Sequence, residues 1–598
     1  MNVVGVSAFF HESACCLLQD GRLVAAVEEE RFSRVKHDPR LPVAAFRHCL
    51  AAGGIGPHQV DCLAYYELPH EKLARQLWAG VPADAPPDLP WLDPRGPERA
   101  LREGLGYEGP VRCYPHHASH AASAFLYSGF DEAAVLTVDG VGEWATTTYG
   151  VGRGNRLTAF EQVEFPHSLG LLYSTLTAYL GFGVNDGEYK VMGLAPYGRP
   201  RHLAALSRLV ESLPGGQYRL DMRYFDFVRG RRMDSPALAE LLGAPRRRPH
   251  EPLTELHCDV ARSLQTLLEE LLLEKVRYLH ARTGATDLCM AGGVALNCVA
   301  NGRIRREGPY ARLFVQPAAG DAGGCLGAAA LASAELSAQV DWRPEPLRHV
   351  FLGPRWSAAE IAELLAAAEL PATDYRGREA ELLAAVAERL AQRQIVGWFH
   401  GASELGPRAL GGRSLLANPQ DPEARPRLNR LIKQREEFRP FAPSVLAEHA
   451  AEHFELDHPS PFMLETCRVT SPLVLPAVTH VDGSARPQTV DAADAPRFAA
   501  LLRELGRRTG CPIVVNTSFN RRGEPIVDSP VDALITMARS GIDALVLEDF
   551  LVERAALPAD WAALLPAWQE RRGSGFEAGG AGGAGGGGVL PADLYTFV

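Results

Sequence analysis

The sequence predicts an α/β protein with two large units. Strand-like and helix-like segments alternate along most of the chain, Gly-rich turns follow several strands, and prolines at Pro344, Pro346 and Pro354 cluster where the pattern restarts. We therefore expect one unit over residues 1–345, a second over 346–572, and a Gly-rich linker and tail over 573–598.

The first unit opens with three predicted strands. VVGVS and SACCLLQ precede the Asp20–Gly21 pair, which is typical of a hairpin turn, and a third strand follows over 22–32. A strand at 111–114 leads into an Ala-rich helix after Pro115, and two β runs over 133–152 flank a Gly-rich turn. A helix over 253–283 then precedes short strands at 287–293 and 313–317.

The second unit has its own α/β alternation. It begins with an Ala/Leu-rich helix over 378–394 and continues with the strand IVGWFH and a polar loop rich in Gly and Arg. The strand and turn PIVVNTSFN follow later. No internal repeat is evident in the sequence.

Composition excludes several functional classes. The 598 residues are 46% hydrophobic and 22% charged, as in globular proteins, and the net charge of −11 weighs against a dedicated nucleic-acid binder. No apolar run reaches the roughly 18 residues of a membrane span, and no basic leader is visible. The 11 cysteines show no CxxC spacing, which is typical of a reducing cytosol. We expect a cytoplasmic protein without membrane or nucleic-acid partners. The sequence leaves open whether the protein forms a homo-oligomer.

Lysine is rare in this chain. Only five of the 61 basic residues are lysines, and Arg supplies the rest. A lysine ammonium is a compact point charge suited to phosphate, so each retained lysine is a candidate for a specific role. Lys190, in a loop-like segment flanked by Gly and aromatic residues, and Lys433 lie inside candidate nucleotide motifs.

A metal site is predicted in the first unit. His116 and His120 are four residues apart on the predicted helix, so both imidazoles project from one face, whereas His117 points elsewhere. An isolated HxxxH is more often an ordinary helix face. Asp139 and Asp321 change this interpretation because both lie where strands give way to loops, and the four together suit Fe(II), Mn(II) or Zn(II).

Three Gly-rich turns follow strands of the first unit and indicate a nucleotide site. None matches a P-loop or a dinucleotide fingerprint, and each alone is more often a plain turn. Together with the opening hairpin they resemble the actin/sugar-kinase/Hsp70 ATPase fold, which holds ATP through scattered strand-end loops. The candidate contacts are Asp139, Gly140, Gly142, Lys190, Gly292, Gly293 and Asn297.

The second unit carries a candidate anion pocket. GASELGPRALGGRS contains Arg408 and Arg413, NRLIKQREEFRPFAPS contains Lys433 and Arg435, and VVNTSFNRRGEPIV supplies small donors. A solvated charged face is the plainer interpretation of the KQREE run alone. Loops rich in Gly, Arg and Ser contribute little to a hydrophobic core, however. We therefore expect these loops to bind a multiply charged anion such as a phosphate.

Seven motifs, in order over about residues 1–555, resemble those of the NodU/CmcH/TobZ-type O-carbamoyltransferases. They are HHASHAASAF, VDGVGEWAT, EYKVMGLAPYG, GGVALNCVANGRI, GPRALGGRS, RPFAPSVL and NTSFNRRGEPIV. The resemblance implies a TsaD-like domain of the actin/Hsp70-like ATPase fold joined to a YrdC-like α/β domain. The YrdC-like domain would convert carbamoyl phosphate and ATP, with Mg(II), to carbamoyl-adenylate. The TsaD-like domain would pass the carbamoyl group to a hydroxyl of a small natural-product or sugar-like acceptor.

The resemblance also assigns roles by motif. His116, His120, Asp139 and Asp321 match iron-type metal ligands, and His11 matches a near-N-terminal histidine, our candidate for the base that deprotonates the acceptor. Lys433 and Arg435 match a KxR motif, Ser518 and Asn520 match an SxN motif, and Arg408 and Arg413 would clamp the phosphate of carbamoyl phosphate.

The chain departs from the family pattern at two positions. Glu12 stands where Asp is common, which affects the geometry expected near the acceptor, and Glu437 stands where an aromatic residue is usual. The Gly-rich tail has no recognised counterpart. Two other functions stay open: a tRNA threonylcarbamoyl-adenosine enzyme with the same folds, and a non-catalytic ATP-dependent regulator. The net charge of −11 disfavours the first, and the anion pocket is unexplained by the second.

Overall fold

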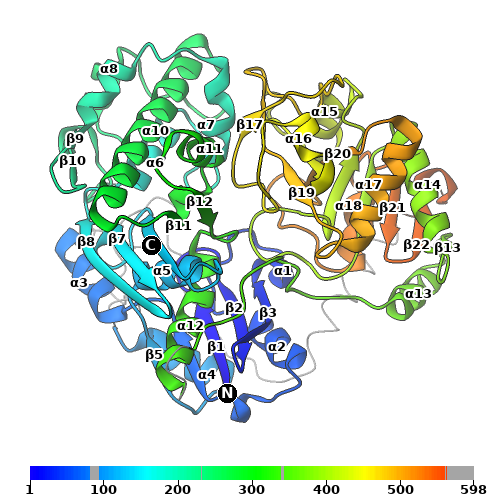
Figure 1. Ribbon diagram of the computed structural model, residues 1–598, viewed down its shortest axis with the longest axis horizontal. Helices are drawn as coiled ribbons and strands as arrows, with labels where there is room; N and C mark the ends of the chain where they lie inside the picture. Colours follow the sequence, from blue (N-terminus) through cyan, green and yellow to red (C-terminus); the bar gives the residue numbers. More distant parts are fainter. Residues whose placement is uncertain (81–92, 231, 338–341, 559–560, 562–598) are drawn as a thin grey trace. The chain divides into compact units, whose positions relative to one another are not determined.

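The computed structural model describes residues 1–80, 93–230, 232–337, 342–558 and 561 (Figure 1). These residues form two compact units of mixed α/β structure. Among the described residues, unit 1 holds Met1–Glu30 and His37–Leu347, whereas unit 2 holds Arg31–Lys36 and the residues from Arg348 to Trp561. The predicted linker and tail, 573–598, lies outside the described residues.

The first sheet of unit 1 has five strands in the order β3-β2-β1-β4-β5. They are β1 (Asn2–Ser7), β2 (Ala14–Gln19), β3 (Arg22–Glu28), β4 (Cys62–Tyr65) and β5 (Val111–Cys113). β2 is antiparallel to both β1 and β3, and β4 is parallel to β1 and β5. The turn between β2 and β3 is the predicted Asp20–Gly21 pair, and both residues have the positive φ that a type I′ hairpin requires.

The second sheet of unit 1 repeats this topology with different strands. Its order is β12-β11-β6-β7-β8. β7 is antiparallel to both β6 and β8, and β11 is parallel to both β6 and β12. The strands are β6 (Glu132–Val138), β7 (Ala145–Arg153), β8 (Arg156–Glu164), β11 (Asp287–Ala291) and β12 (Arg312–Val315). Unit 1 is therefore a structural duplication, which the sequence analysis did not detect.

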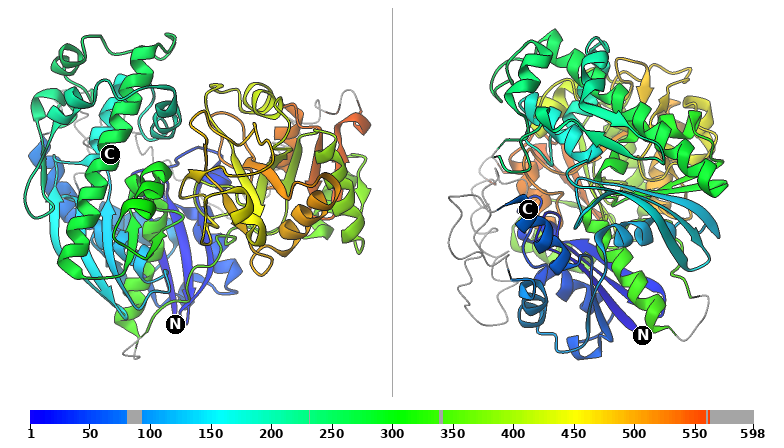
Figure 2. Two further views of the ribbon diagram at one scale, coloured as in Figure 1. Left: turned by 45° about the horizontal axis from the view of Figure 1, so that its top comes forward. Right: turned by 90° about the vertical axis from the view of Figure 1, so that its left-hand side faces the viewer.

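Helices cover the two sheets (Figure 1). The longer ones are α2 (Val43–Ala52), α3 (Pro69–Ala79), α4 (Gly96–Leu105), α5 (His116–Phe125), α6 (Leu169–Tyr179), α10 (Glu255–Thr283), α11 (Cys298–Glu307) and α12 (Gly324–Leu336). The shorter α7 (Glu188–Leu194), α8 (Leu203–Leu206) and α9 (Pro236–Leu242) and the hairpin of β9 (Val210–Ser212) and β10 (Tyr218–Leu220) complete the unit. The long green helix in Figure 2 is α10, which packs against α6, α7 and α11.

The packing of α12 on α5 positions the candidate metal ligands. α12 also contacts β1 of the first sheet, and α5 contacts β6 and β11 of the second. Gly327 allows the two helices to approach closely, because a Cβ at this residue would lie 1.7 Å from the carbonyl oxygen of Ser119 on α5. The start of α12 and the histidine-bearing face of α5 are thereby held together.

Unit 2 is built on one mixed sheet of eight strands, in the order β13-β22-β21-β14-β15-β20-β16-β19. They are β13 (Thr373–Asp374), β14 (Val396–Phe399), β15 (Arg413–Ala417), β16 (Ala442–Leu446), β19 (Gln488–Val490), β20 (Ile513–Ser518), β21 (Ala544–Leu547) and β22 (Phe550–Glu553). Successive residues face opposite sides, so that Ile513 and Val515 join one apolar core and Val514 joins the other.

Helices complete both cores of unit 2. α14 (Glu379–Ala391) and α17 (Pro496–Thr509) cover one face, and α13 (Ala358–Ala367) and α18 (Pro530–Ala538) cover the other. Shorter elements are α15 (Ala424–Arg427), α16 (Ala450–His453), β17 (Cys467–Arg468) and β18 (Ser484–Ala485). Arg34, from the short α1 (Glu30–Ser33) region, donates to the carbonyl oxygens of Pro525 and Ile526, which fastens the segment Arg31–Lys36 into unit 2.

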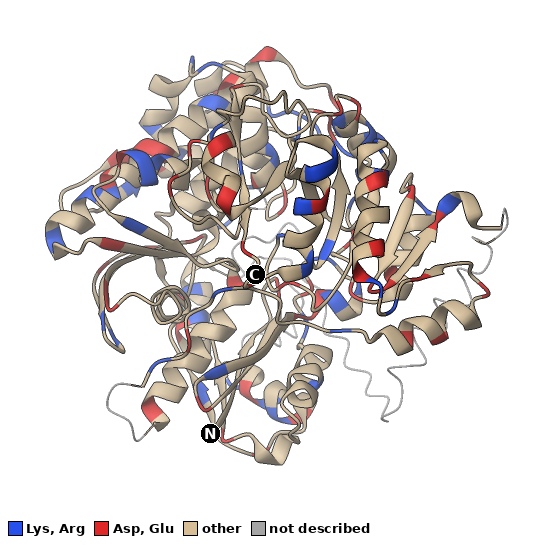
Figure 3. Ribbon diagram, turned by 45° about the vertical axis from the view of Figure 1, so that its right-hand side comes forward, with Lys and Arg blue, Asp and Glu red and all other residues tan. Residues whose placement is uncertain are grey.

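Acidic and basic residues are interspersed along the elements of both units (Figure 3). Many form ion pairs near the surface, such as Arg153 with Glu132 and Arg503 with Glu448. Pairs of this kind contribute at most about 1 kcal/mol each. Within the described residues, none of the helices combines the length and apolarity needed to span a bilayer.

Candidate active site

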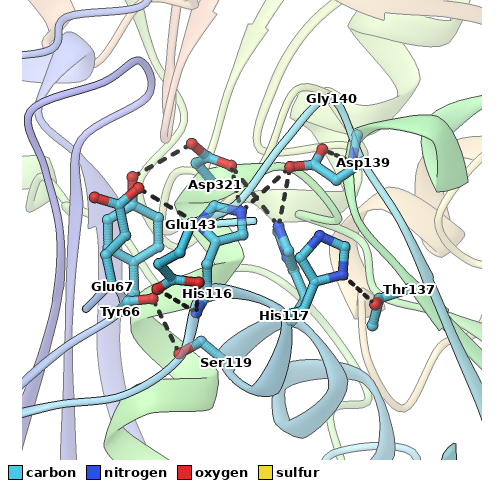
Figure 4. Close-up of polar contacts among 12 residues, drawn as sticks. Tyr66, Glu67, His116, His117, Ser119, Thr137, Asp139, Gly140, Glu143 and Asp321 are labelled. Atoms are coloured by element: carbon cyan, nitrogen blue, oxygen red, sulfur yellow. Dashed lines mark hydrogen bonds and ion pairs between the residues drawn. The ribbon is translucent and has the colours of Figure 1, made fainter. Parts of the chain in front are cut away.

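Four buried side chains of unit 1 converge on one point (Figure 4). His116 and His120 lie on one face of α5, Asp139 follows the last residue of β6, and Asp321 lies just before α12. One ligand atom from each lies within 4.8 Å of the others. The structure thus brings together all four residues that the sequence suggested as metal ligands.

The nitrogen and oxygen atoms face one another at distances that leave room for an ion. His116 Nε2 lies 3.2 Å from Asp139 Oδ2 and 3.6 Å from Asp321 Oδ1. His120 Nε2 lies 3.7 and 3.8 Å from the same two oxygens, and neither of its ring nitrogens has a hydrogen-bond partner among the described residues. A buried imidazole without such a partner fits a metal ligand, because leaving a polar group unsatisfied is costly.

The electrostatics of the cluster favour a bound cation. Burial alone would raise the pKa of Asp139, but the neighbouring imidazoles of His116 and His120 hold that pKa well below its usual value. Burial would lower the pKa of His116, yet the charges of Asp321 and Asp139 raise it well above normal. The pKa of Asp321 is raised by burial, an effect that the charge of His11 partly offsets. A divalent ion would displace protons from these groups on binding.

A second layer of polar residues surrounds His116, and the sequence analysis missed it. Glu67 Oε1 lies 3.6 Å from His116 Nδ1, and the Glu143 carboxylate accepts the backbone N–H of His116 at 2.9 Å. Lys72, one of the five lysines, contacts Glu67 at 3.0 Å. The signal in the sequence that could have pointed to these residues was the rarity of lysine, because Lys72 is one of only five. His117 points away from the cluster, as predicted, with Nδ1 at 2.6 Å from Thr137 Oγ1.

The glycine-rich turns lie beside the cluster. The Gly293 N–H donates to Asp139 Oδ1 at 2.7 Å, and Gly142 packs against His116. Gly292 has a φ of 92°, and a Cβ there would lie 2.2 Å from the carbonyl oxygen of Val138, so this position requires glycine. At Gly140 a Cβ would meet no atom within 4 Å, which leaves open space beside Asp139.

Asn297 has structural partners. Its Oδ1 accepts from Ala300 N–H and caps α11, and its amide pairs with that of Gln265 at 3.0 Å in both directions. Because both ends of the amide are already bonded, the predicted contact of this side chain with a nucleotide would require it to exchange partners.

His11 and Lys190 lie at the two ends of a chain of ionisable side chains. His11 Nδ1 is 3.9 Å from Glu12 Oε2, and Glu12 Oε1 is 3.2 Å from His37 Nδ1. His37 Nε2 is 4.0 Å from Asp186, which is 3.7 Å from Lys190 Nζ. The expectation of a loop at Lys190 was wrong: the residue lies on α7, where Glu188 at the first position favours the helix N-terminus.

Unit 2 brings the KxR and SxN motifs together. Lys433, at the end of a π-helical turn over Leu428–Lys433, donates to Ser518 Oγ at 3.1 Å, to Asn520 Oδ1 at 2.6 Å and to the Ser518 carbonyl. Arg435 donates to Asn429 at 2.8 Å and stacks on Phe441.

Of the two cations of the KxR motif, Lys433 is buried and Arg435 is half-buried. Burial lowers the pKa of Lys433 well below its usual value, and the charge of Arg435 adds to this effect. The pKa of Arg435 is likewise lowered by burial and by the charge of Arg439. Among the described residues, the hydrogen-bond acceptors of Lys433 are all neutral. An anion beside these groups would relieve the cost of taking their positive charges out of water.

The two arginines of the GPRALGGRS loop differ in environment. Arg413 is fully buried, stacks on Phe399 and donates to the carbonyl oxygens of four residues, namely Pro354, His400, Gly401 and Gly412. These are the contacts of a structural residue, so the geometry does not favour the predicted phosphate clamp at Arg413. Glu404 shapes the same loop by accepting the N–H groups of Leu410 and Gly412 at 2.7 Å. Arg408 is only half-buried.

Comparison with sequence families decides the class of protein. Residues 2–84 and 102–330 match the family described as "Carbamoyltransferase N-terminus", and residues 387–554 match "Carbamoyltransferase C-terminus". The chain belongs to the carbamoyltransferase family. It is therefore an enzyme of carbamoyl transfer, and both family regions carry candidate site residues.

Relatives of this carbamoyltransferase span nearly the same length. An uncharacterised protein of Synechocystis is 44% identical over 600 residues, covering 93% of this chain and 97% of that protein. Nodulation protein NolNO of Sinorhizobium fredii is 39% identical, with 93% and 81% covered. Nodulation protein NolO of Bradyrhizobium diazoefficiens is 42% identical, with 75% and 80% covered.

Solved structures align with part of this carbamoyltransferase at low similarity. The ROK hexokinase from Thermus thermophilus is 17% identical, covering 55% of this chain and 97% of that one, with a TM-score of 0.27. HypF from T. kodakarensis is 15% identical, covering 56% and 48%, with a TM-score of 0.31. Similarity this low assigns no ligand.

Proposed function

We propose that this carbamoyltransferase is an ATP-dependent O-carbamoyltransferase with a separate chemical step in each unit. In unit 2, water would first hydrolyse carbamoyl phosphate to carbamate and phosphate. The carbamate oxygen would then attack the α-phosphate of ATP, supplied with Mg(II), to give carbamoyl-adenylate and release pyrophosphate. Unit 1 would then transfer the carbamoyl group to a hydroxyl of a small-molecule acceptor. The observation that carries the proposal is the buried convergence of His116, His120, Asp139 and Asp321 in unit 1.

The fold of unit 1 supports a nucleotide-binding role. A duplicated five-stranded sheet is the shared feature of the actin/Hsp70-like ATPase fold, and both sheets of unit 1 have this order. Asp139 and Gly140 follow β6, and Gly292 and Gly293 follow β11, which is parallel to β6, so these turns meet at one edge of the sheet. We assign the adenylate to this edge and a YrdC-like fold to unit 2.

Charge balance supports a divalent metal in unit 1. Glu67, Glu143, Asp139 and Asp321 are buried carboxylates around the cluster, and Lys72 and Arg75 are the cations beside Glu67. With neutral histidines, these groups leave two negative charges for an M²⁺ ion to neutralise. The metal held by His116, His120, Asp139 and Asp321 would supply positive charge for the phosphate of the adenylate. The donor set suits Fe(II), Mn(II) or Zn(II), and the family resemblance favours Fe(II).

His11 is our candidate for the general base. Its imidazole is near enough to Asp321 for its charge to affect the pKa of that carboxyl, and its side chain is 22% exposed. In the transfer step His11 would take the proton of the acceptor hydroxyl, the acceptor oxygen would bond to the carbamoyl carbon, and AMP would leave. A sugar-like or other natural-product hydroxyl is the acceptor to be tried first.

The division of labour can be tested without knowing the acceptor. The purified full-length enzyme is given ATP and carbamoyl phosphate, and carbamoyl-adenylate is measured by mass spectrometry. Lys433→Ala should abolish its formation, because the variant loses the cation that contacts Ser518 and Asn520. His120→Ala should form it normally. Normal formation by Lys433→Ala, or equal loss in both variants, would refute the assignment.

A further inference from the structure

A carboxylate lies beside His116 on the side of the ring away from the cluster. His116 Nε2 faces Asp139 and Asp321, whereas Nδ1 faces Glu67 Oε1 at 3.6 Å (Figure 4). Both side chains are buried, and Nδ1 has no hydrogen bond among the described residues. Glu67 is therefore the acceptor nearest to the ring N–H that His116 would carry when Nε2 binds a metal.

Glu67 is itself held in place by two partners. Lys72 on α3 donates to both of its carboxylate oxygens, at 3.2 and 3.0 Å, and the Tyr65 hydroxyl at the end of β4 lies 3.3 Å from Oε2. Lys72 Nζ also lies 5.4 Å from the centre of the Phe10 ring. A carboxylate contacted at both oxygens has little freedom to turn, so its direction toward His116 is fixed by the fold.

We propose that Glu67, fixed by Lys72, is a positioning residue that orients the His116 ring for metal binding. A histidine that donates one ring N–H to a carboxylate keeps the lone pair of its other nitrogen aimed at the metal, and loss of such a partner weakens metal affinity by about 10- to 100-fold. The inference rests on the proposed metal site. It gives a function to one of the five lysines, because an ammonium reaches both oxygens of one carboxylate as a compact charge.

Glu143 has a different function and provides a contrast. Its carboxylate accepts the backbone N–H groups of His116 and Leu68, at 2.9 and 2.7 Å, and so joins the start of α5 to the segment after β4. It supports the helix rather than the ring. A variant at Glu143 is expected to reduce stability, whereas a variant at Glu67 is expected to act on the metal.

The test measures metal binding directly. Co(II) affinity of the full-length enzyme is determined by chelator competition, together with the visible absorption of bound Co(II), for wild type, Glu67→Gln, Lys72→Met and Lys275→Met. Lys275 is a buried lysine of the same unit that pairs with Glu274, and it serves as the matched control. We expect Glu67→Gln to weaken Co(II) binding by about 10- to 100-fold and to alter the spectrum. Lys72→Met should do the same to a smaller extent, and Lys275→Met should not.

The outcomes separate this inference from the metal site itself. If His120→Ala binds Co(II) as wild type does, the proposed metal site is wrong. If His120→Ala loses Co(II) but Glu67→Gln and Lys72→Met keep wild-type affinity and spectrum, only the positioning function is wrong. Should Glu67→Gln fail to fold, as judged by thermal unfolding, Lys72→Met alone decides the question.

Discussion

His116 Nε2 lies 3.2 Å from Asp139 Oδ2, although one residue opens a helix and the other follows a strand. The contact depends on how α5 packs against the second sheet of unit 1. It places an imidazole and a carboxylate side by side in a buried site, and both are ligand types of transition-metal ions.

Asp139→Asn should separate the two proposed steps of the reaction. The substitution keeps the shape of the side chain but removes the negative charge that faces both histidines. We expect metal affinity to fall by about 100-fold and carbamoyl transfer to be lost, while carbamoyl-adenylate still forms in unit 2. Metal analysis and a two-step assay check this. Undiminished metal content in Asp139→Asn would contradict the ligand assignment.

Gly327→Ala should disturb the site from a distance. The added methyl group would collide with the Ser119 carbonyl at 1.7 Å, so α12 must move away from α5 and carry Asp321 with it. Overpacking of this kind costs about 1–3 kcal/mol, and we expect lower thermal stability together with weaker metal binding. Gly140→Ala is the control for stability, because a Cβ there meets no atom within 4 Å. Equal melting temperatures for both variants would count against this packing.

Arg413 and Arg408 should respond differently to replacement by lysine. Lysine cannot reproduce the donation of Arg413 to four carbonyl groups, so Arg413→Lys should lower the free energy of unfolding by about 2–4 kcal/mol. Arg408→Lys should leave stability nearly unchanged and raise the KM for carbamoyl phosphate. Chemical denaturation and steady-state kinetics distinguish the two. A stable Arg413→Lys with a raised KM would restore the phosphate clamp to Arg413.

Asp528 should make the stability of unit 2 depend on pH. Burial raises the pKa of this carboxyl from 3.8 to about 6, although the charge of Arg413 opposes the rise. Between those values the unfolded chain loses a proton that the folded chain keeps, so this group lowers the free energy of unfolding as pH rises from about 4 to 6, by roughly 3 kcal/mol at most. Asp528→Asn has no carboxyl group to titrate at this position. The free energy of unfolding of the variant minus that of wild type should therefore increase from about pH 4 to 6 and stay constant above that range. Denaturation at pH 4.5 and 7 checks this, and a constant difference would contradict it.

Most of the strands and the four converging side chains could be predicted from the sequence because both follow from local rules. HxxxH on a helix and an Asp after a buried strand are visible without any tertiary information. Glu67 and Lys72 were missed because their position beside His116 depends on long-range packing. The carbonyl contacts of Arg413 could not be predicted, because a Gly/Arg loop has the same sequence whether its guanidinium faces a ligand or turns back onto its own carbonyl groups.

The duplication of unit 1 also escaped sequence analysis. Strand order is conserved between the two sheets, but order is a property of pairing and leaves no fixed residue pattern. The short helix at Lys190 was missed for a related reason. The seven-residue segment Glu188–Leu194 contains Gly193 and has weak helical propensity. Its helical structure therefore depends on packing against α6 and α10.

The segment Arg31–Lys36 has a practical consequence for anyone who wishes to study the units apart. Because it belongs to unit 2 while its flanking residues belong to unit 1, the described part of the chain passes from one unit to the other three times. A gene fragment starting at Arg348 would encode a unit 2 without Arg34, leaving the carbonyl groups of Pro525 and Ile526 without their donor. The two proposed steps are thus better dissected with point variants than by truncation.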